Sequence, residues 1–403
     1  MHNQKTIIFS YQLLSNVGCE IIIRGTIAFL TRAFPHYDLR FVVSSYDLER
    51  DRSILADLDN VEVVPMIGWK RYLRGVLVKT GLDRWFWTPR FAARHFRKAD
   101  LLVSVGGDIY AISGNDLPRD WLGWERFATR HNIPSIMFGA NMEKFEVLSP
   151  SVLAELIEHL KRFRLIAVRD TVTLDYLAKY GVTDNTVFFP DPIFSLRPSC
   201  RFSTSPVRSI GLNMSPFLLR EYGPGVFKHM AKIVEGLVTR GYRLNLIPHV
   251  YASDGNPKLQ DSVSLRQLYD LLPEAVRPAV SLYEGPMSLA DMAREIHAVD
   301  LFIGARMHSC LNAVTLGKPT YFLAYSSKAQ TMVLWLRQGP LAALPDRVDC
   351  GPADVITLDA ILALIDAQEL GLNTAPLDVD FGTGLDSSPI GQMLTQTAIF
   401  KAQ

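Results

Sequence analysis

One stretch decides the fold class of this chain: VDLFIGARMHSC, residues 299–310. The apolar run at residues 299–303 predicts a buried strand, and the residues from Cys310 onward predict the start of a helix. A strand that leads straight into a helix is the repeating unit of parallel α/β sheets. Arg306 and His308 therefore lie where the helix begins, a place where the positive end of the helix dipole favours an anion.

Arg306 and His308 carry the chemistry of this turn. Arginine offers a planar fork to a carboxylate or phosphate, and histidine can carry a proton near neutral pH. The alternative is an arginine held in a salt bridge and a histidine packed at the helix start. The next expected strand is followed by Tyr325 and Lys328. Because the carboxyl ends of parallel strands open on one edge, we expect these four side chains to face one cavity.

Strand and helix patterns alternate along most of the chain. The alternation predicts an α/β fold with two doubly wound parallel sheets, each covered by helices on both faces, that face a central cleft. We predict an N-terminal domain over residues 1–195, a C-terminal domain over 206–345 and a C-terminal extension over 346–403. The expected strands cover residues 6–10, 39–44, 61–65, 101–105, 134–138, 165–168, 207–212, 243–248, 299–303 and 320–323.

The composition is that of an ordinary globular protein, with 48% hydrophobic and 21% charged residues among 403. We expect neither a secretory leader nor a transmembrane helix, and hence a cytoplasmic protein. The four cysteines are far apart and have no metal-ligand spacing, so free thiols and no metal site are expected. A net charge of +1 argues against a nucleic-acid partner.

A basic, aromatic segment covers residues 69–98. It holds nine Lys or Arg residues and one acid, Asp83, interleaved with tryptophan, tyrosine and phenylalanine. Such a pattern suits peripheral contact with an anionic membrane surface. The alternative is a solvated cationic helix whose aromatic side chains pack on the domain core.

Two glycine-containing strand ends of the N-terminal half are candidate acceptor-binding positions. Gly106 and Gly107 predict a tight turn that lets a ligand approach the backbone, and Asp108 beside them is a candidate general base. The alternative for Asp108 is a bond to its own turn. Asn141 and Glu143 follow the next strand in the same way.

Four more residues lie where strands meet helices or loops. Arg169 precedes a helix that Asp170 is expected to cap, and is a candidate anion contact. His249 ends a strand of the second half and either binds ligand or bonds within its loop. Asn16 and Gly18 join the first strand to the first helix, where a ligand contact and an ordinary helix cap are both open.

Taken in order, these pieces resemble the polysaccharide pyruvyl transferase family over roughly Ile7 to Trp335. The residues that carry the resemblance are Asn16-Val17-Gly18, Gly106-Gly107, Gly139, Val168-Arg169-Asp170, Asp191-Pro192, Pro248-His249, Arg306-Met307-His308-Ser309, Gly317-Lys318-Pro319, Tyr325 and Lys328.

The resemblance implies two Rossmann-like domains in a GT-B-like arrangement and no cofactor. It implies transfer of the pyruvyl group of phosphoenolpyruvate, a co-substrate, onto two hydroxyls of a sugar in a surface polysaccharide or its lipid-linked oligosaccharide precursor. His308 would protonate the enol carbon and Asp108 would accept a hydroxyl proton. The donor contacts would be Arg306, Lys328, Arg169, Ser309, Tyr325 and His249. The acceptor contacts would be Asn16, Gly18, Gly106, Gly107, Asn141 and Glu143.

Two positions depart from the family pattern. Cys19 stands where an Asp or Asn usually follows the first glycine, and Asp108 where a third glycine is usual. These two departures give weight to one alternative, a non-catalytic, sugar-binding family member. A second alternative is a nucleotide-sugar-dependent glycosyltransferase of similar fold, which would also use an arginine, a lysine and a helix start to bind a diphosphate. The basic segment fits an enzyme held at the inner face of the cell membrane.

Overall fold

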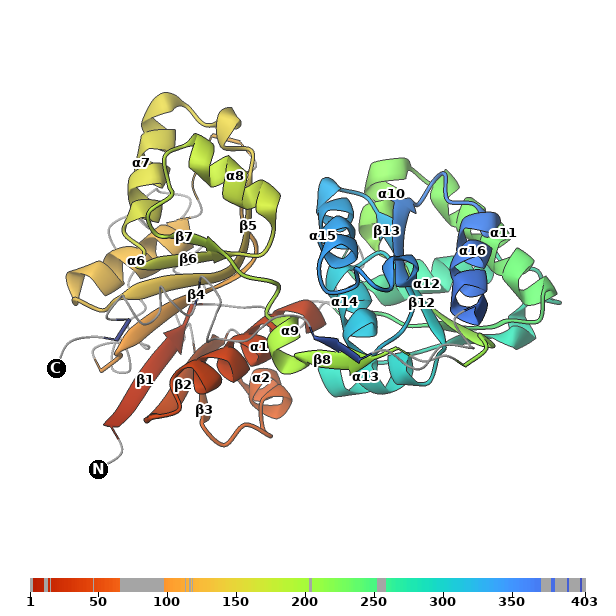
Figure 1. Ribbon diagram of the computed structural model, residues 1–403, viewed down its shortest axis with the longest axis horizontal. Coiled ribbons are helices and arrows are strands. Elements are labelled where there is room, and N and C mark those ends of the chain that lie inside the picture. The colour runs from red at the N-terminus through yellow and green to blue at the C-terminus, as the bar shows by residue number, and fades with distance from the viewer. Residues whose placement is uncertain are drawn as a thin grey trace. The chain divides into compact units, whose positions relative to one another are not determined.

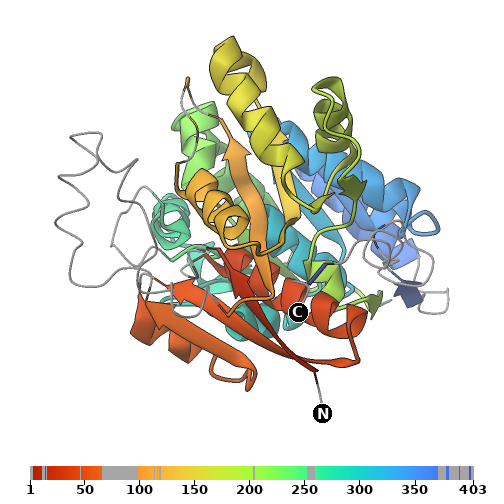
Figure 2. The same cartoon turned by 90° about the vertical axis from the view of Figure 1, so that its left-hand side faces the viewer.

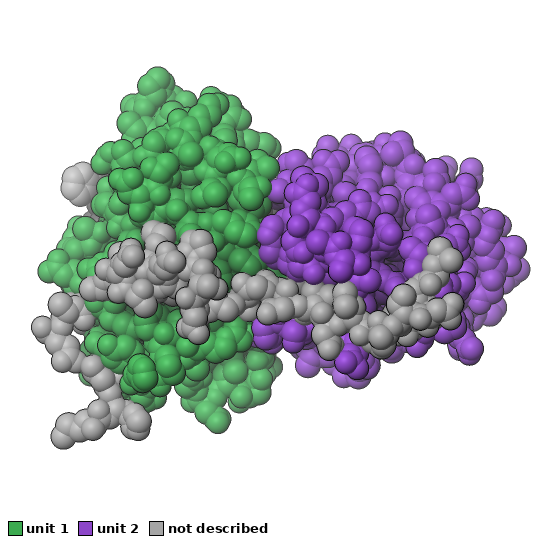
Figure 3. All heavy atoms as spheres, viewed as in Figure 1, with its two compact units in different colours: residues 1–14, 22–195, 384–403 green, residues 15–21, 196–383 purple. Residues whose placement is uncertain are grey.

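The computed structural model divides the chain into two compact units. Unit 1 comprises residues 1–14, 22–195 and 384–403, and unit 2 comprises residues 15–21 and 196–383 (Figure 3). The structure describes residues 3–10, 14, 16–45, 47–65, 98–112, 114, 115, 117, 119–202, 205–251, 259–370, 378–380, 390, 399 and 400. The basic, aromatic segment therefore lies outside the described residues except for Lys98.

Unit 1 is built on a seven-stranded parallel sheet in the order β3-β2-β1-β4-β5-β6-β7 (Figure 1). The strand order reverses between β1 and β4, and ligands of such sheets bind at the carboxyl ends beside this point. The strands are β1 (Asn3–Phe9), β2 (Tyr37–Ser45), β3 (Val61–Pro65), β4 (Leu101–Ala111), β5 (Ser135–Glu143), β6 (Leu165–Val168) and β7 (Thr186–Phe188).

Helices cover both faces of this sheet because successive strand residues point to opposite sides. Ile7 and Phe9 pack on the face covered by α1. Ile8 points the other way, to Trp124 and Phe127 of α6, and α6 and α7 lie in front of the sheet in Figure 2. The helices in the described part of this unit are α1 (Val17–Ala33, whose first residues belong to unit 2), α2 (Leu48–Ile54), α6 (Arg119–Arg130), α7 (Pro150–Lys161), α8 (Thr171–Lys179) and α9 (Ile193–Leu196).

The predicted turn at Gly106 and Gly107 is wrong. Both glycines lie inside β4, where Gly107 pairs with Ala140 and the register to β5 shifts before Tyr110. β5 likewise continues past Gly139, which has a φ of +76° and lies where the register to β6 shifts. Glycine tolerates such irregular strand backbone, so the ladder bends here without ending.

Unit 2 is built on a six-stranded parallel sheet in the order β11-β10-β9-β12-β13-β14, with the reversal between β9 and β12. The predicted fold class, two parallel-sheet α/β domains, is thereby confirmed. The strands are β9 (Ser209–Asn213), β10 (Arg243–Leu246), β11 (Val280–Leu282), β12 (Leu301–Gly304), β13 (Thr320–Ala324) and β14 (Val348–Pro352).

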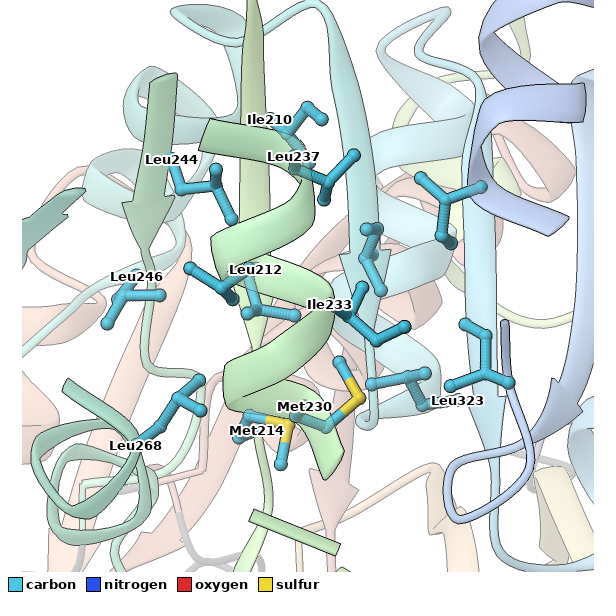
Figure 4. Packing of buried hydrophobic residues seen from close by; sticks show 14 of the residues in the cluster. Ile210, Leu212, Met214, Met230, Ile233, Leu237, Leu244, Leu246, Leu268 and Leu323 are labelled. Carbon is cyan, nitrogen blue, oxygen red and sulfur yellow. The ribbon is translucent and has the colours of Figure 1, made fainter. Parts of the chain in front are cut away.

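The main core of unit 2 lies on one face of this sheet. Alternate strand residues such as Ile210, Leu212 and Leu244 pack there against Met230 and Leu237 (Figure 4). In Figure 1, α11 and α16 lie on one side of the sheet, and α14 and α15 on the other. The helices are α10 (Pro216–Tyr222), α11 (Gly225–Thr239), α12 (Asp261–Asp270), α13 (Leu289–His297), α14 (Met307–Thr315), α15 (Ser327–Gln338) and α16 (Leu358–Leu370).

The C-terminal part of the chain contributes to both units. β15 (Asp378–Asp380) pairs antiparallel with β8 (Ser199–Arg201), and Ile390 and Ile399 are buried in the core of unit 1 beside α1. Among the residues that the structure describes, three short 3-10 helices cover Phe145–Val147, Arg277–Ala279 and Pro345–Arg347. No helix in the part of the chain that the structure describes combines the length and the apolar character that crossing a bilayer requires.

Candidate functional site

The carboxyl edge of the unit 2 sheet gathers polar side chains at its reversal point. β9 ends in Asn213, whose buried side-chain Oδ1 accepts a bond from the backbone N–H of Arg306 at 3.1 Å. Arg306 directly precedes α14, as the strand-to-helix pattern predicts. The two strands that flank the reversal are thus joined at the residue where α14 begins.

Asp261, the first residue of α12, is the centre of this edge. Its fully buried carboxylate accepts bonds from Nδ2 of Asn213 at 3.2 Å and from the backbone N–H groups of His249 and Val250, both at 3.1 Å. Nε and Nη2 of Arg306 also donate to it, at 3.1 and 2.8 Å. Asp261 therefore binds the loop after β10, the end of β9 and the start of α14 together.

Arg306 is a nearly buried cation held between an acid and an aromatic ring. Its Cζ lies 4.7 Å from the ring centroid of Phe217, on α10. Burial alone would lower the pKa of Arg306, but coulombic attraction and hydrogen bonds to Asp261, together with Tyr325, leave that pKa raised. The guanidinium therefore stays charged, and the bond to Asp261 fixes its position.

His308 and His249 lie together against the first turn of α1. Their rings are near parallel, with centroids 6.5 Å apart and an interplanar angle of 11°. A Cβ atom added to Gly18 would stand 2.7 Å from Nδ1 of His308 and 3.2 Å from Nε2 of His249. The absence of a side chain at Gly18 is thus what lets both imidazoles approach the helix.

Asn16 acts as the helix cap that its position allows. Its Oδ1 accepts a bond from the Gly18 backbone N–H at 2.9 Å, and it forms an isolated antiparallel bridge with Val250. Residues 15–21 belong to unit 2, so Asn16 and Gly18, predicted as acceptor contacts, lie beside the predicted donor contact His249 and the predicted acid His308.

His249 is held as a neutral imidazole. Burial, followed by the nearby charges of His308 and Arg306, places its pKa well below the ordinary value of 6.5. Nδ1 lies 3.2 Å from the sulfur of Met292 on α13. Among the described residues nothing hydrogen-bonds to Nε2, the atom that faces Gly18.

The remaining predicted donor residues of unit 2 lie on the same edge. Ser309 is fully buried, and its hydroxyl donates to the carbonyl of Arg306 at 2.7 Å, so it stabilises the first turn of α14. The Tyr325 ring meets Phe217 edge-on at 6.0 Å. Lys328 lies in the first turn of α15 and is partly exposed.

Arg169 belongs to a separate, buried network in unit 1. Its Nη1 donates to Asp191 at 2.7 Å and its Nε donates to Asn141. The Asn141 amide donates in turn to Asp170. Asp170 accepts from the backbone N–H of Thr173 and caps α8, as predicted. The predicted acceptor residue Asn141 is thus engaged at both ends of its amide.

The other predicted acceptor positions of unit 1 lie in β4 and β5. Gly106, Gly107 and Asp108 are in β4, and the Asp108 side chain lies outside the described residues. Glu143 is the last residue of β5 and is partly exposed. In the described part of the chain, no group of three or more His, Cys, Asp and Glu side chains is placed to hold a metal ion.

Sequence reasoning missed three residues of the unit 2 edge. Asn213 could have been predicted from the sequence, since it is a polar residue at the end of a strand, followed closely by a Ser-Pro pair that is typical of a helix start. Phe217 and Asp261 could not, because an aromatic or acidic residue in a first helical turn is common in any protein.

Several solved structures resemble this fold, three of them as follows. UDP-GlcNAc 2-epimerase from Methanocaldococcus jannaschii is 11% identical over 98% of this chain and 100% of its own, with a TM-score of 0.57. The epimerase from Neisseria meningitidis, bound to UDP-GlcNAc, is 12% identical over 98% and 100%, with a TM-score of 0.57. Anabaena Alr3699/HepE, in complex with UDP and glucose, is 10% identical over 92% and 95%, with a TM-score of 0.53.

Identities this low show the fold alone, and that fold is GT-B-like. No curated protein is significantly similar to this chain in sequence. The sequence model of one family, polysaccharide pyruvyl transferase, matches residues 16–327. This match covers more than half of the chain and includes Arg169, Arg306 and His308, so the chain belongs to the polysaccharide pyruvyl transferase family.

Proposed function

We propose that this chain transfers the pyruvyl group of phosphoenolpyruvate onto two hydroxyls of a sugar in a surface polysaccharide or its lipid-linked precursor, with release of phosphate. Family membership supports the transferase class. The observation that carries the proposal is the grouping of His308, His249 and Arg306 around the start of α14. This edge offers a proton carrier and a permanent cation within one site.

The proposed reaction needs an acid at the enol carbon. His308 would protonate the terminal CH2 of phosphoenolpyruvate, which makes the neighbouring carbon electrophilic. One sugar hydroxyl then adds to that carbon and loses its proton to a base. The C–O bond to phosphate breaks, the second hydroxyl closes the cyclic ketal, and its proton leaves with the phosphate or a base. His249 beside His308 is neutral and so adds no further positive charge to the site.

The donor carries a carboxylate and a phosphate, both of which favour hydrogen bonds from cations. We assign Arg306, Lys328 and Tyr325 to this donor, with Ser309 and His249 as residues that fix the start of α14 and the His308 ring. Arg169 in unit 1 stays a proposed anion contact, although Asp191 already pairs with it.

On the acceptor side we propose Asp108 as the base for the first hydroxyl. Gly106 and Gly107 would allow close approach to the β4 backbone, and Asn141 and Glu143 end the neighbouring strand. We reassign Asn16 and Gly18 from the acceptor to the donor side, because a Cβ atom at Gly18 would meet both imidazoles. No cofactor and no metal enter the proposal.

We further propose that the basic, aromatic segment at residues 69–98 holds the enzyme against the cytoplasmic face of the membrane, where a lipid-linked acceptor lies. Neutral substitutions of its Lys and Arg residues should lower activity on a lipid-linked acceptor and spare activity on a short soluble sugar. Equal losses on both acceptors would contradict this role.

The first test is a thermal-shift titration of the purified chain with phosphoenolpyruvate, UDP-sugars and nucleoside diphosphates. A ligand that binds only the folded state raises the melting temperature. We expect phosphoenolpyruvate to raise the melting temperature of both the unchanged chain and His308→Gln. The unchanged chain should release phosphate from phosphoenolpyruvate, and His308→Gln should lose this activity. A shift with UDP-sugars alone would instead indicate a glycosyltransferase. Two of the similar structures were solved with related ligands, one with UDP-GlcNAc and one with UDP and glucose. Glycan binding without either donor would indicate a non-catalytic member.

A further inference from the structure

The permanent cation of the unit 2 edge is already neutralised. Arg306 donates from two nitrogens to Asp261, whose carboxylate is fully buried and cannot turn away to solvent. The pair carries no net charge, whereas the proposed donor carries both a carboxylate and a phosphate. Binding such an anion in a partly buried site requires a further cation whose charge is not already balanced.

Arg220 supplies a guanidinium beside this pair. Its Cζ lies 4.7 Å from the ring centroid of Phe217, and the Cζ of Arg306 lies 4.7 Å from the same centroid. The two guanidinium carbons are therefore separated by no more than twice that distance. One aromatic ring positions both cations through its electron-rich faces.

The helix that carries Arg220 is fixed at the carboxyl edge of the sheet. α10 follows β9 directly, and Ser215 caps it through a bond from the Phe217 backbone N–H. Near its other end, the Tyr222 hydroxyl donates to the carbonyl of Ala324, the last residue of β13, at 2.7 Å. Arg220 thus lies on the edge that also carries Arg306 and Tyr325.

Arg220 has its hydrogen-bond donors available. Its side chain is exposed, and among the described residues it makes no ion pair and no hydrogen bond, only the contact with Phe217. A guanidinium held by stacking loses little freedom when it binds a carboxylate or phosphate through two parallel bonds.

We propose that Arg220 binds the phosphate or the carboxylate of the donor, with Phe217 as the residue that positions it. This inference rests on the proposed function, since it takes the ligand to be a small molecule bearing both groups. Arg306 then orients the start of α14 and shares the anion, while Arg220 adds a positive charge to that of the proposed donor contact Lys328.

The test is isothermal titration of the full-length chain with phosphoenolpyruvate. Arg220→Ala should weaken binding by roughly 10- to 100-fold, the effect of losing a charge-assisted hydrogen-bond pair. Arg220→Lys keeps the positive charge but not the planar guanidinium, and its affinity should lie between those of the unchanged chain and Arg220→Ala. Arg240→Ala is the matched control, since Arg240 is also an exposed arginine of unit 2 but bonds only within α11. Melting temperatures without ligand should stay within a few degrees of the unchanged chain.

The outcomes separate the two levels of the proposal. If the unchanged chain binds phosphoenolpyruvate and Arg220→Ala binds it equally well, this inference is wrong and the proposed function stands. If the unchanged chain binds only nucleotide ligands, both fail. If Arg220→Ala and Arg240→Ala lose affinity to the same extent, the effect is one of general surface charge and the assignment to Arg220 is overturned.

Discussion

Replacing Gly18 by alanine is the most direct probe of the imidazole pair. The added carbon would stand 2.7 Å from Nδ1 of His308, and ordinary contacts begin at 3.4 Å, so the ring must retreat by about 0.7 Å. The added carbon would also stand 3.1 Å from Oδ1 of Asn16 and 3.2 Å from Nε2 of His249, so it has little room to shift away from His308. The change therefore displaces the proposed acid without removing it.

Displacement of this size should appear in turnover. A misplacement of about 1 Å costs about 100-fold in rate, and a general acid contributes about 100- to 10,000-fold. We expect kcat for phosphate release to fall by about 10- to 100-fold in Gly18→Ala, with KM for phosphoenolpyruvate changed much less. The free energy of unfolding should fall by no more than about 2.5 kcal/mol, because overpacking costs about 1–3 kcal/mol while alanine in a helix recovers about 0.5–1 kcal/mol.

Gly225→Ala is the control for this experiment. Gly225 also lies in a first helical turn, that of α11, but an added Cβ there meets nothing within 4 Å. We expect its kcat and KM to equal those of the unchanged chain. A normal kcat in Gly18→Ala would refute the argument, and a rise confined to KM for the acceptor would restore Gly18 to the acceptor side.

Three further predictions concern buried groups. Asp261→Asn should lower the free energy of unfolding by about 3–5 kcal/mol, because Arg306 is left as an unpaired buried charge; a urea-denaturation loss below about 1 kcal/mol would contradict this. Burial holds the pKa of His249 below that of the unfolded chain, so the unfolded state takes up the proton first, and stability should be lost as pH falls below about 6.5. His249→Gln should lose less of its free energy of unfolding between about pH 7.5 and 5.5 than the unchanged chain does. If the dependence of stability on pH is the same in both proteins, the effect belongs to another group. Burial raises the pKa of the Cys310 thiol, so mass spectrometry should find it unalkylated by iodoacetamide in the native chain and modified only after unfolding.

Most of the fold was predictable because its signals are local. The strands at Val61–Pro65 and Leu165–Val168 are confirmed at both ends, since each is an apolar pattern bounded by polar or turn residues. The paired glycines after Val105 misled the prediction. Glycine is typical of turns, but here the neighbouring strand β5 continues the ladder, and pairing outweighs local preference.

The candidate site was predictable only in part. The sequence by itself places Arg306 and His308 at a strand-to-helix junction, because periodicity and turn chemistry act over a few residues. Only the tertiary structure decides that Asp261 neutralises Arg306, that Arg220 and Arg306 share the ring of Phe217, and that Gly18 lies against His308. These contacts join residues far apart in the chain, and they arise when parallel strands align their carboxyl ends and bring separate loops to one edge.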